Sequence, residues 1–426
     1  MSMNFGPLPE QFIWATGVEN TFIPQGRPGQ RPLDEFELMS HYSCWKDDLR
    51  LCQELGVQAI RWGAPWYRLE PHPGVFDWNW TDEVIPYIVE ELGITPIVDL
   101  IHYGCPFWLK REFINSGYAD AVSRYAAEFA NRYSKLVRFY TPLNEPVVNA
   151  LMCGKRGIWP PYLRGETGYI RVLLQIVKGM LQTAARLREA APTAKLVFVE
   201  ATGLSRAADA DLEPLAMEDQ HRGYICYDLL TGRLVPGHPL YTWLLRNGVS
   251  PKTLDEIARN PVQIDVLGMN FYPQWSVKQL YVNRNGRIAS RVSEGQASFS
   301  SLIEDYYRRY NVPIMITETS AFGSDEVRLT WLRESVGAIR GLREKGVPVY
   351  GYTWFPMHTM IDWRYRLGTE PAEKYRIELG LYKLQENAGN GSRWQSTSLV
   401  KAFSELVSNP CSAIGNMKES LQGVPQ

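Results

Sequence analysis

The stretch FYTPLNEP, residues 139–146, starts as an apolar run that suits a buried β-strand and ends in a turn that carries Glu145. The stretch PIMITETS, residues 313–320, repeats this pattern, with Glu318 directly after an apolar strand. Around these two stretches, short β-type runs alternate with longer helical patterns over the whole chain. This rhythm is the signature of βα units and of a parallel sheet.

The number of βα units predicts a closed barrel. Strands are expected at residues 12–16, 59–62, 96–101, 136–141, 195–199, 266–270, 313–317 and 347–353. Amphipathic segments such as 42–55, 119–133, 169–190 and 326–345 are long enough to cross back over the outside of a barrel. Eight strands with helical coverings predict an α/β fold that is a single (β/α)8 TIM barrel.

The chain shows no internal repeat and no linker rich in Pro, Gly or Ser that would divide it. Residues 1–408 are therefore expected to form one barrel domain, and residues 409–426 a flexible C-terminal tail. Four stretches after predicted strands are expected to be irregular loops, at residues 25–32, 155–167, 201–236 and 272–298. In barrels, loops of this kind form the active-site face.

Composition narrows the class of protein. Hydrophobic residues make up 45% of the 426 residues and charged residues 21%, which allows a large core and argues against disorder. The formal net charge is -1 and like charges form no runs, so no nucleic-acid or membrane partner is expected. No apolar stretch is as long as a membrane span and the N-terminus does not resemble a signal peptide, which predicts a cytoplasmic protein. The six cysteines are dispersed, so neither a metal site nor a disulfide framework is predicted.

The two glutamates follow the fourth and seventh predicted strands, at the end where barrel enzymes place catalytic groups. Cleavage of a glycosidic bond with retention needs two carboxyl groups about 5 to 5.5 Å apart, one to attack the anomeric carbon and one to protonate the leaving oxygen. Asn144 would contact a sugar hydroxyl, while Arg61 and Tyr272 would keep Glu318 ionised. A single glutamate after a strand is usually a helix cap or a surface charge. Two at matching strand ends favour catalysis.

Six motifs, in the correct order, resemble glycoside hydrolase family 1, and the resemblance covers nearly the whole chain. TPLNEP at residues 141–146 resembles the acid/base motif TxNEP of that family. ITETS at residues 316–320 resembles its nucleophile motif ITENG. The resemblance therefore implies that Glu145 is the acid/base and Glu318 the nucleophile.

The other motifs imply sugar contacts. HYSCWKDDLRLCQELGVQAIRW is similar to the unit whose arginine, here Arg61, lies beside the nucleophile, and GITPIVDLIHYGCPFWL to the strand whose histidine, here His102, binds the sugar. DVLGMNFYP is similar to the family's sixth strand and supports Asn270 and Tyr272 as site residues. GVPVYGYTWFPMHTMIDW looks like its eighth strand, with Trp354 as the floor under the sugar. Three further aromatic residues fit sugar contact and plain packing equally well: Tyr103, Trp159 and Trp275.

The sequence departs from the family pattern at the sugar-recognition positions. The first strand leads into FIWATGVENTF in place of the family's QxEG stretch, which puts Glu19 or Asn20 where a glutamine grips sugar hydroxyls. After the eighth strand, Asp362 and Trp363 stand in for the family's Glu and Trp. The changed residues Glu19, Asn20 and Asp362 are expected to shape the distal part of the sugar site. No basic cluster resembles the phosphate site of 6-phospho-glycosidases.

The resemblance implies a retaining, exo-acting β-glycosidase, similar to β-glucosidases, that hydrolyses terminal β-linked sugars by double displacement. Its partner would be a small β-glycoside or oligosaccharide, and two carboxyl groups would suffice without a metal ion or an organic cofactor. Two alternatives stay open: a transglycosylase with the same carboxyl pair, and a sugar-binding barrel without turnover. A barrel that had lost turnover would be expected to lack one carboxylate, and both are present.

Overall fold

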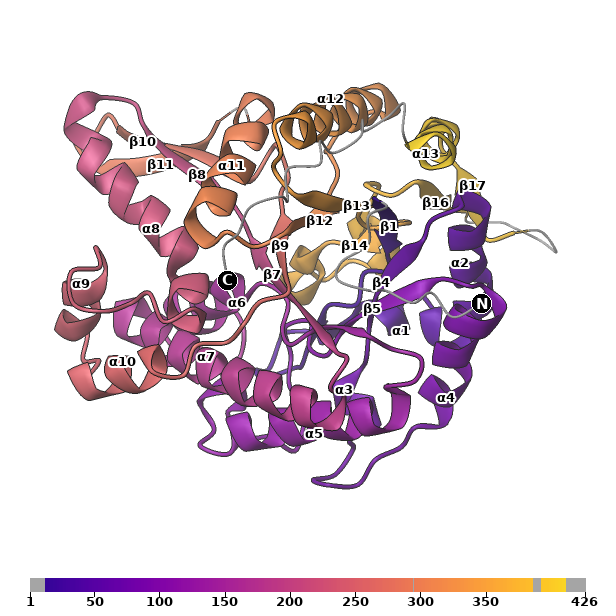
Figure 1. Cartoon of the computed structure of the whole chain (residues 1–426), viewed down its shortest axis with the longest axis horizontal. Coiled ribbons are helices and arrows are strands. Elements are labelled where there is room, and N and C mark those ends of the chain that lie inside the picture. Colours follow the sequence, from indigo (N-terminus) through magenta and orange to yellow (C-terminus); the bar gives the residue numbers. More distant parts are fainter. Residues whose placement is uncertain (1–11, 294, 386–391, 411–426) are drawn as a thin grey trace, which may run out of the picture.

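Parallel strands close into a barrel at the centre of the molecule (Figure 1). The structure is a computed structural model that describes residues 12–293, 295–385 and 392–410. The eight barrel strands are, in their order around the barrel, β1 (Ile13–Gly17), β4 (Ala59–Gly63), β5 (Thr95–Asp99), β6 (Phe139–Thr141), β7 (Lys195–Ala201), β9 (Val266–Asn270), β12 (Ile314–Thr319) and β13 (Val349–Trp354). Each overlaps one of the predicted runs, and parallel pairing of β13 with β1 closes the barrel. The prediction of a (β/α)8 barrel is confirmed.

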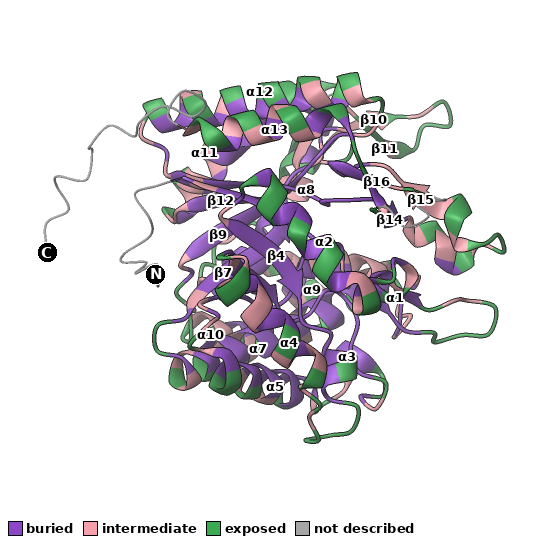
Figure 2. Ribbon diagram, turned by 90° about the vertical axis from the view of Figure 1, so that its right-hand side faces the viewer, coloured by how far each residue is buried: buried purple, intermediate pink, exposed green. Residues whose placement is uncertain are grey.

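Helices surround the barrel, with their buried residues facing it (Figure 2). The longer helices are α2 (His41–Leu55), α5 (Tyr118–Tyr133), α7 (Gly165–Ala190), α8 (Glu213–Leu230), α11 (Phe299–Tyr310), α12 (Asp325–Glu344) and α13 (Ser398–Ser408). The shorter ones are α1 (Glu35–Leu38), α3 (Trp66–Leu69), α4 (Asn79–Pro86), α6 (Pro146–Asn149), α9 (Tyr241–Arg246) and α10 (Pro251–Ala258). The four predicted amphipathic segments correspond to α2, α5, α7 and α12, because an apolar stripe at helical spacing packs against the sheet.

The barrel interior is apolar only towards the amino ends of its strands. One cluster of buried side chains fills it there, made of Ala15, Ala59, Ile97, Phe139, Val197, Val199, Val266 and Met315. Side chains two residues apart on a strand point to the same face. Arg61 follows Ala59 by two residues and Asp99 follows Ile97 by two, so both point into the barrel nearer its carboxyl end. The buried charged side chains of Arg61 and Asp99 thus lie next to the apolar cluster, on the side of the carboxyl ends of the strands.

Two stretches predicted to be irregular contain regular structure, and that prediction is wrong. Residues 201–236 include β8 (Leu204–Ala207) and α8, and residues 272–298 include β10 (Val277–Val282) and β11 (Ile288–Val292). These three strands form a separate sheet in the order β11-β10-β8. β8 pairs with β10 from a distant loop, and β10 pairs with β11 in a hairpin. The strands are mostly half-buried or exposed, so they lack the apolar run that marks the barrel strands.

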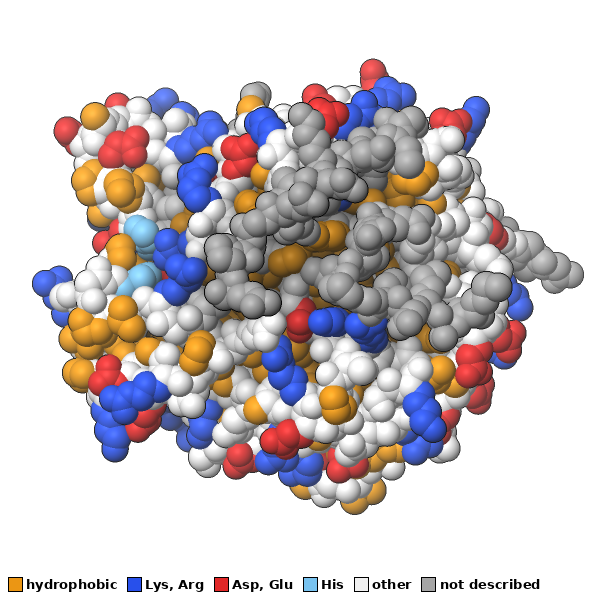
Figure 3. Space-filling model, viewed as in Figure 1, with side chains coloured by type: hydrophobic (Ala, Val, Ile, Leu, Met, Phe, Trp, Pro, Cys, Tyr) orange, Lys and Arg blue, Asp and Glu red, His pale blue; other side chains and the backbone are white. Residues whose placement is uncertain are grey.

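Among the described residues, three pairs of short strands lie in the loops: β2 (Phe22–Ile23) with β3 (Leu33–Asp34), β14 (Met360–Ile361) with β15 (Arg376–Ile377), and β16 (Tyr382–Leu384) with β17 (Trp394–Ser396). Within the described part of the chain, no helix has the length and apolar character needed to cross a bilayer. On the face seen in Figure 3, Lys and Arg side chains are interspersed with Asp and Glu. Of the predicted tail, only residues 409 and 410 lie within the described ranges.

A buried polar cluster fastens the C-terminal segment to α2. Asp48, on α2, accepts a hydrogen bond from the Trp394 indole N–H at 2.7 Å and pairs with His41 Nδ1 at 2.8 Å. The Trp394 ring also stacks on His358, with the ring centres 4.2 Å apart. Burial works to raise the pKa of Asp48, but the hydrogen bond and the charge of His41 outweigh it and the pKa is lowered. The carboxylate form therefore holds β17 against the barrel's outer layer.

Replacing Asp48 by Ala should lower the free energy of unfolding by about 3 kcal/mol, because His41 and Trp394 would lose a buried partner. Urea denaturation followed by tryptophan fluorescence measures this loss. The matched control is Asp47→Ala on the same helix, where the side chain is 65% exposed and pairs only with Arg50. That change should cost less than about 0.5 kcal/mol. Equal losses at the two positions would contradict the assigned role of Asp48.

Candidate active site

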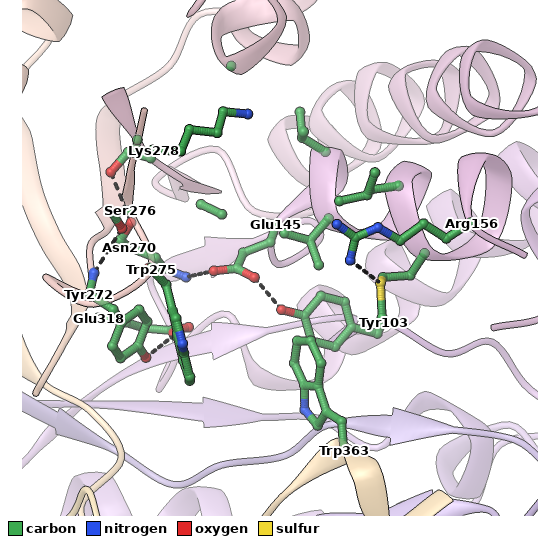
Figure 4. Close-up of a pocket in the computed structure, with 18 of the residues that line it drawn as sticks. Tyr103, Glu145, Arg156, Asn270, Tyr272, Trp275, Ser276, Lys278, Glu318 and Trp363 are labelled. Atoms are coloured by element: carbon green, nitrogen blue, oxygen red, sulfur yellow. Dashed lines mark hydrogen bonds between the residues drawn. The ribbon is translucent and has the colours of Figure 1, made fainter. Parts of the chain in front are cut away.

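A cavity of about 820 Å³ opens at the carboxyl ends of the barrel strands and contains both predicted catalytic glutamates (Figure 4). Its inner wall comes from the ends of barrel strands and the turns after them. Its outer wall comes from residues 147–156, from α7 and α8, and from the β8–β10 sheet. Eight predicted site residues line it: Glu19, His102, Glu145, Asn270, Tyr272, Glu318, Asp362 and Trp363. The fold therefore brings together residues that are far apart in the sequence.

Glu318 is held by one donor on each carboxylate oxygen. Arg61 Nη1 donates to Oε1 at 2.5 Å, and the Tyr272 hydroxyl donates to Oε2 at 2.7 Å. The pairing register of β12 shifts after Ile316 relative to both neighbouring strands, and such an irregularity re-aims a side chain at a strand end. Glu318 thus lies in the cavity wall with its orientation fixed from two sides.

Burial and the neighbouring charged groups have opposing effects on the pKa of Glu318. Burial raises its pKa, and the nearby Glu145 and Glu19 carboxyl groups add to the rise, while Arg61 and His102 lower it. The balance leaves the pKa of Glu318 at about 7. A nucleophilic carboxyl group must be ionised, so Arg61 is the main interaction that keeps this group available near neutral pH.

Glu145 stands just after β6, at the first turn of α6. Its backbone φ is 47°, in the region that favours glycine, and its N–H donates to Val199 O at 3.1 Å. Asn270 Nδ2 donates to Oε1 of Glu145 at 2.8 Å, and the Tyr103 hydroxyl donates to Oε2. Figure 4 shows Glu145 between these two donors. The side chain is buried but faces the cavity.

A hydrogen-bonded group beside the glutamates joins three strand ends. His102 Nδ1 lies 3.2 Å from Asp99 Oδ2, and His102 Nε2 lies 3.1 Å from Asn144 Nδ2. Nε2 is also 3.5 Å from Glu19 Oε1, an oxygen that accepts hydrogen bonds from the Thr21 N–H and hydroxyl. Burial lowers the pKa of His102, but the charges of Glu19 and Asp99 outweigh it and the pKa is raised. These groups form a polar inner end suited to sugar hydroxyls.

Known proteins resemble this chain both in sequence and in fold. Residues 35–220 match the model of glycosyl hydrolase family 1. The protein named "Beta-glucosidase A" from Thermotoga maritima is 25% identical over 94% of this chain and 99% of its own length. The "Aryl-phospho-beta-D-glucosidase BglA" from Bacillus subtilis is 23% identical over 89% of this chain and 86% of its own. Among solved structures, the family 1 β-glucosidase from Thermotoga maritima has a TM-score of 0.80 at 19% identity, with 95% of this chain and 99% of that chain covered.

The family model, which matches part of the chain, and the relatives together support glycosyl hydrolase family 1, with the low identity of a divergent sequence. This confirms the family predicted from the motifs. It also confirms the predicted class of enzyme, since the family 1 match and the relatives named β-glucosidase identify a glycoside hydrolase that acts on β-glycosides. The low identity agrees with the changed sequence at the sugar-recognition positions.

The residues at and beside the positions that depart from the family pattern have different surroundings from one another in this structure. Both Asp362 oxygens accept hydrogen bonds from Arg364, from its backbone N–H at 2.8 Å and from Nε at 2.7 Å. Asn20 does not line the cavity, because its amide packs against Gly63 behind the wall. Trp363 lines the cavity beside Asp362. Of the four divergent residues, Glu19 and Trp363 therefore have the most direct access to a ligand.

Other predicted residues lie behind the surface of the cavity. Arg61 and Asn144 do not line it, but they contact each other at 3.1 Å and reach the cavity through Glu318 and His102. Trp354 is completely buried, and its indole N–H donates to Leu379 O at 3.0 Å. Its role as a floor under the sugar stays a prediction. Within the described ranges, no group of three or more His, Cys, Asp or Glu residues is arranged to hold a metal ion.

Sequence reasoning missed two features of the site. One is the hydrogen bond that the Tyr103 hydroxyl donates to Glu145. The only signal for it in the sequence was the position of this tyrosine next to His102. Glu200, at the end of β7, is buried and accepts hydrogen bonds from the N–H groups of Val147 and Ala201. Burial raises the pKa of Glu200 well above its ordinary value, and the charge of Glu145 adds to this effect. The glutamate of KLVFVEA, like Glu145 and Glu318, lies at a strand's carboxyl end, and this was the available signal.

Replacing Arg61 by Lys should move the acidic limb of the kcat/KM profile upwards by about one pH unit. The reason is that one ammonium group cannot pair with Asp99 and Glu318 as the guanidinium fork does, so Glu318 would bind its proton more tightly. The wild-type limb is expected near pH 7, from the pKa of Glu318. The profile is measured with an aryl β-glycoside. Arg328→Lys, at a buried arginine that bonds to Gly380 O, is the matched control. A limb that stays in place in Arg61→Lys would contradict this link.

Proposed function

We propose that this family 1 enzyme is a retaining, exo-acting β-glycosidase that hydrolyses terminal β-linked sugars through a covalent glycosyl-enzyme on Glu318. The observation that carries the proposal is the contrasting support of the two cavity carboxyl groups. Glu318 is paired with a buried guanidinium, whereas Glu145 is held by the neutral donors Asn270 and Tyr103. A group beside a cation suits a nucleophile, and a group among neutral donors can gain and lose a proton.

The reaction follows from these positions in two steps. In the first step a Glu318 oxygen bonds to the anomeric carbon, the glycosidic C–O bond breaks, and Glu145 gives its proton to the departing oxygen. In the second step Glu145 takes a proton from water. The water oxygen bonds to the anomeric carbon, and the bond to Glu318 breaks. Arg61 and Tyr272 stabilise the carboxylate that is released.

The walls of the cavity suggest how a substrate would lie. The sugar would occupy the inner end, where His102 and Glu19 offer polar groups, and the leaving group would extend towards the β8–β10 sheet. Trp275 is 56% exposed and its ring centre lies 4.2 Å from that of Phe322, which provides an apolar surface along this path. Relatives named β-glucosidase favour a glucoside among the candidate substrates. A small β-glycoside or oligosaccharide is the proposed ligand.

Replacing Glu318 by Gln should reduce kcat by about 10⁴-fold or more, because the amide cannot form the glycosyl-enzyme. Activity is measured with a panel of aryl β-glycosides that differ in the sugar. The same substitution at Glu326, an exposed residue on α12, is the matched control and should leave kcat unchanged. Near-normal turnover by Glu318→Gln would refute the nucleophile assignment.

Replacing Glu145 by Ala should slow glycosides with poor leaving groups by about 10²-fold or more and activated aryl glycosides far less in their first step. Added azide should then release a β-glycosyl azide, because a small anion can attack the glycosyl-enzyme where the carboxylate is missing. Product analysis by NMR gives the anomeric configuration. An equal loss on all substrates, or an α-azide, would contradict a retaining mechanism with Glu145 as acid/base.

A further inference from the structure

The Tyr103 hydroxyl contacts Glu145, and the two-step reaction does not by itself define how this contact affects either step. Tyr103 follows His102 and is 3% exposed, and its hydroxyl donates to Glu145 Oε2. Figure 4 shows the phenol ring beside Trp363, with its oxygen directed at the Glu145 carboxyl group. The hydroxyl therefore contacts a reacting residue from inside the cavity wall.

The backbone and the neighbouring rings fix Tyr103 in this position. Its φ is 84°, in the region that favours glycine, and such a conformation persists only where surrounding contacts hold it. The ring packs against Trp159 and Trp363, with centre-to-centre distances of 5.0 Å and 5.3 Å. Glu145 also has a positive φ, of 47°. Both partners of this hydrogen bond thus adopt unfavourable backbone conformations that aim them at each other.

The second oxygen of Glu145 is also fixed. Asn270 Oδ1 accepts a hydrogen bond from the Thr317 hydroxyl at 2.7 Å, so the amide must present its Nδ2 to Glu145 Oε1. Each oxygen of the carboxyl group therefore faces a donor. Two donors, one on each oxygen, fix the direction in which the carboxyl group points.

We propose that Tyr103 is a positioning residue that acts through Glu145 by holding its carboxyl group in the orientation in which it takes a proton from water in the second step. This inference rests on the proposed acid/base role of Glu145. A phenol can both donate and accept, so Tyr103 can also accept a hydrogen bond when Glu145 is protonated after that step. The tyrosine transfers no proton to the substrate, and it sets how readily Glu145 acts as the base.

The test is Tyr103→Phe, which keeps the ring that packs against the two tryptophans. With a 2,4-dinitrophenyl β-glycoside, whose first step needs no protonation, kcat should fall about tenfold and KM should fall with it. The value of kcat/KM should change little. A rapid-mixing experiment should show a burst of dinitrophenol close to one equivalent of enzyme, since the glycosyl-enzyme accumulates.

Tyr140→Phe is the matched control. Tyr140 is equally buried, and its hydroxyl donates to Val137 O at 3.0 Å, away from the cavity. This variant should leave the burst and the KM as in the wild type. Thermal melting of both variants separates a folding defect from a kinetic one.

Two results with Tyr103→Phe would overturn the inference. A rise in KM for every substrate without a burst would make the hydroxyl a sugar contact, and wild-type kinetics would give it no role. Either result leaves the proposed function intact if Glu145→Ala still yields the β-glycosyl azide. Failure of that azide reaction would instead refute the proposed function itself.

Discussion

The buried guanidinium of Arg61 is the interaction on which the active site depends. A cation that is completely buried must be paired, and Arg61 is paired with Asp99 and Glu318, each at 2.5 Å. Its other contacts reach Asn144 Oδ1 and the main-chain oxygen of Thr317. One side chain from β4 therefore joins β5, the turn after β6, and β12 across the mouth of the barrel.

The two anions that share Arg61 differ in their other surroundings. Asp99 is also bonded to His102, and its pKa is lowered although burial alone would raise it. Burial raises the pKa of Glu318, the nearby Glu145 and Glu19 add to the rise, and Arg61 and His102 offset only part of it. Arg61 thus pairs with two carboxyl groups of different acidity: the pKa of Asp99 is lowered, and the pKa of Glu318 is raised. This division lets a reactive group persist in a buried, strongly charged setting.

The outer half of the cavity is built differently from the inner half. The side chains of the inner half come from the ends of barrel strands, whose backbone positions are fixed by hydrogen bonds to both neighbouring strands. The outer half comes from β8, β10 and α8, whose position depends on pairing between two long loops. Loops on a fixed scaffold can change without disturbing the barrel. This separation allows one carboxyl pair to serve different leaving groups, and it explains how a chain so distant from its relatives keeps the chemistry.

The sequence by itself determined the barrel, the family and the two glutamates, because each barrel strand is a local apolar run and each glutamate directly follows one. It did not reveal the β11-β10-β8 sheet, since those strands are mostly half-buried or exposed and β8 pairs with β10 from far along the chain. It placed Asn20 and Glu19 together, yet only packing against Gly63 turns Asn20 away from the cavity while Glu19 lines it. The contact of Tyr103 with Glu145 also belongs to the tertiary structure alone. A hydrogen bond between two turns depends on backbone angles and on the closure of the barrel, and neither is written in the identity of any single residue.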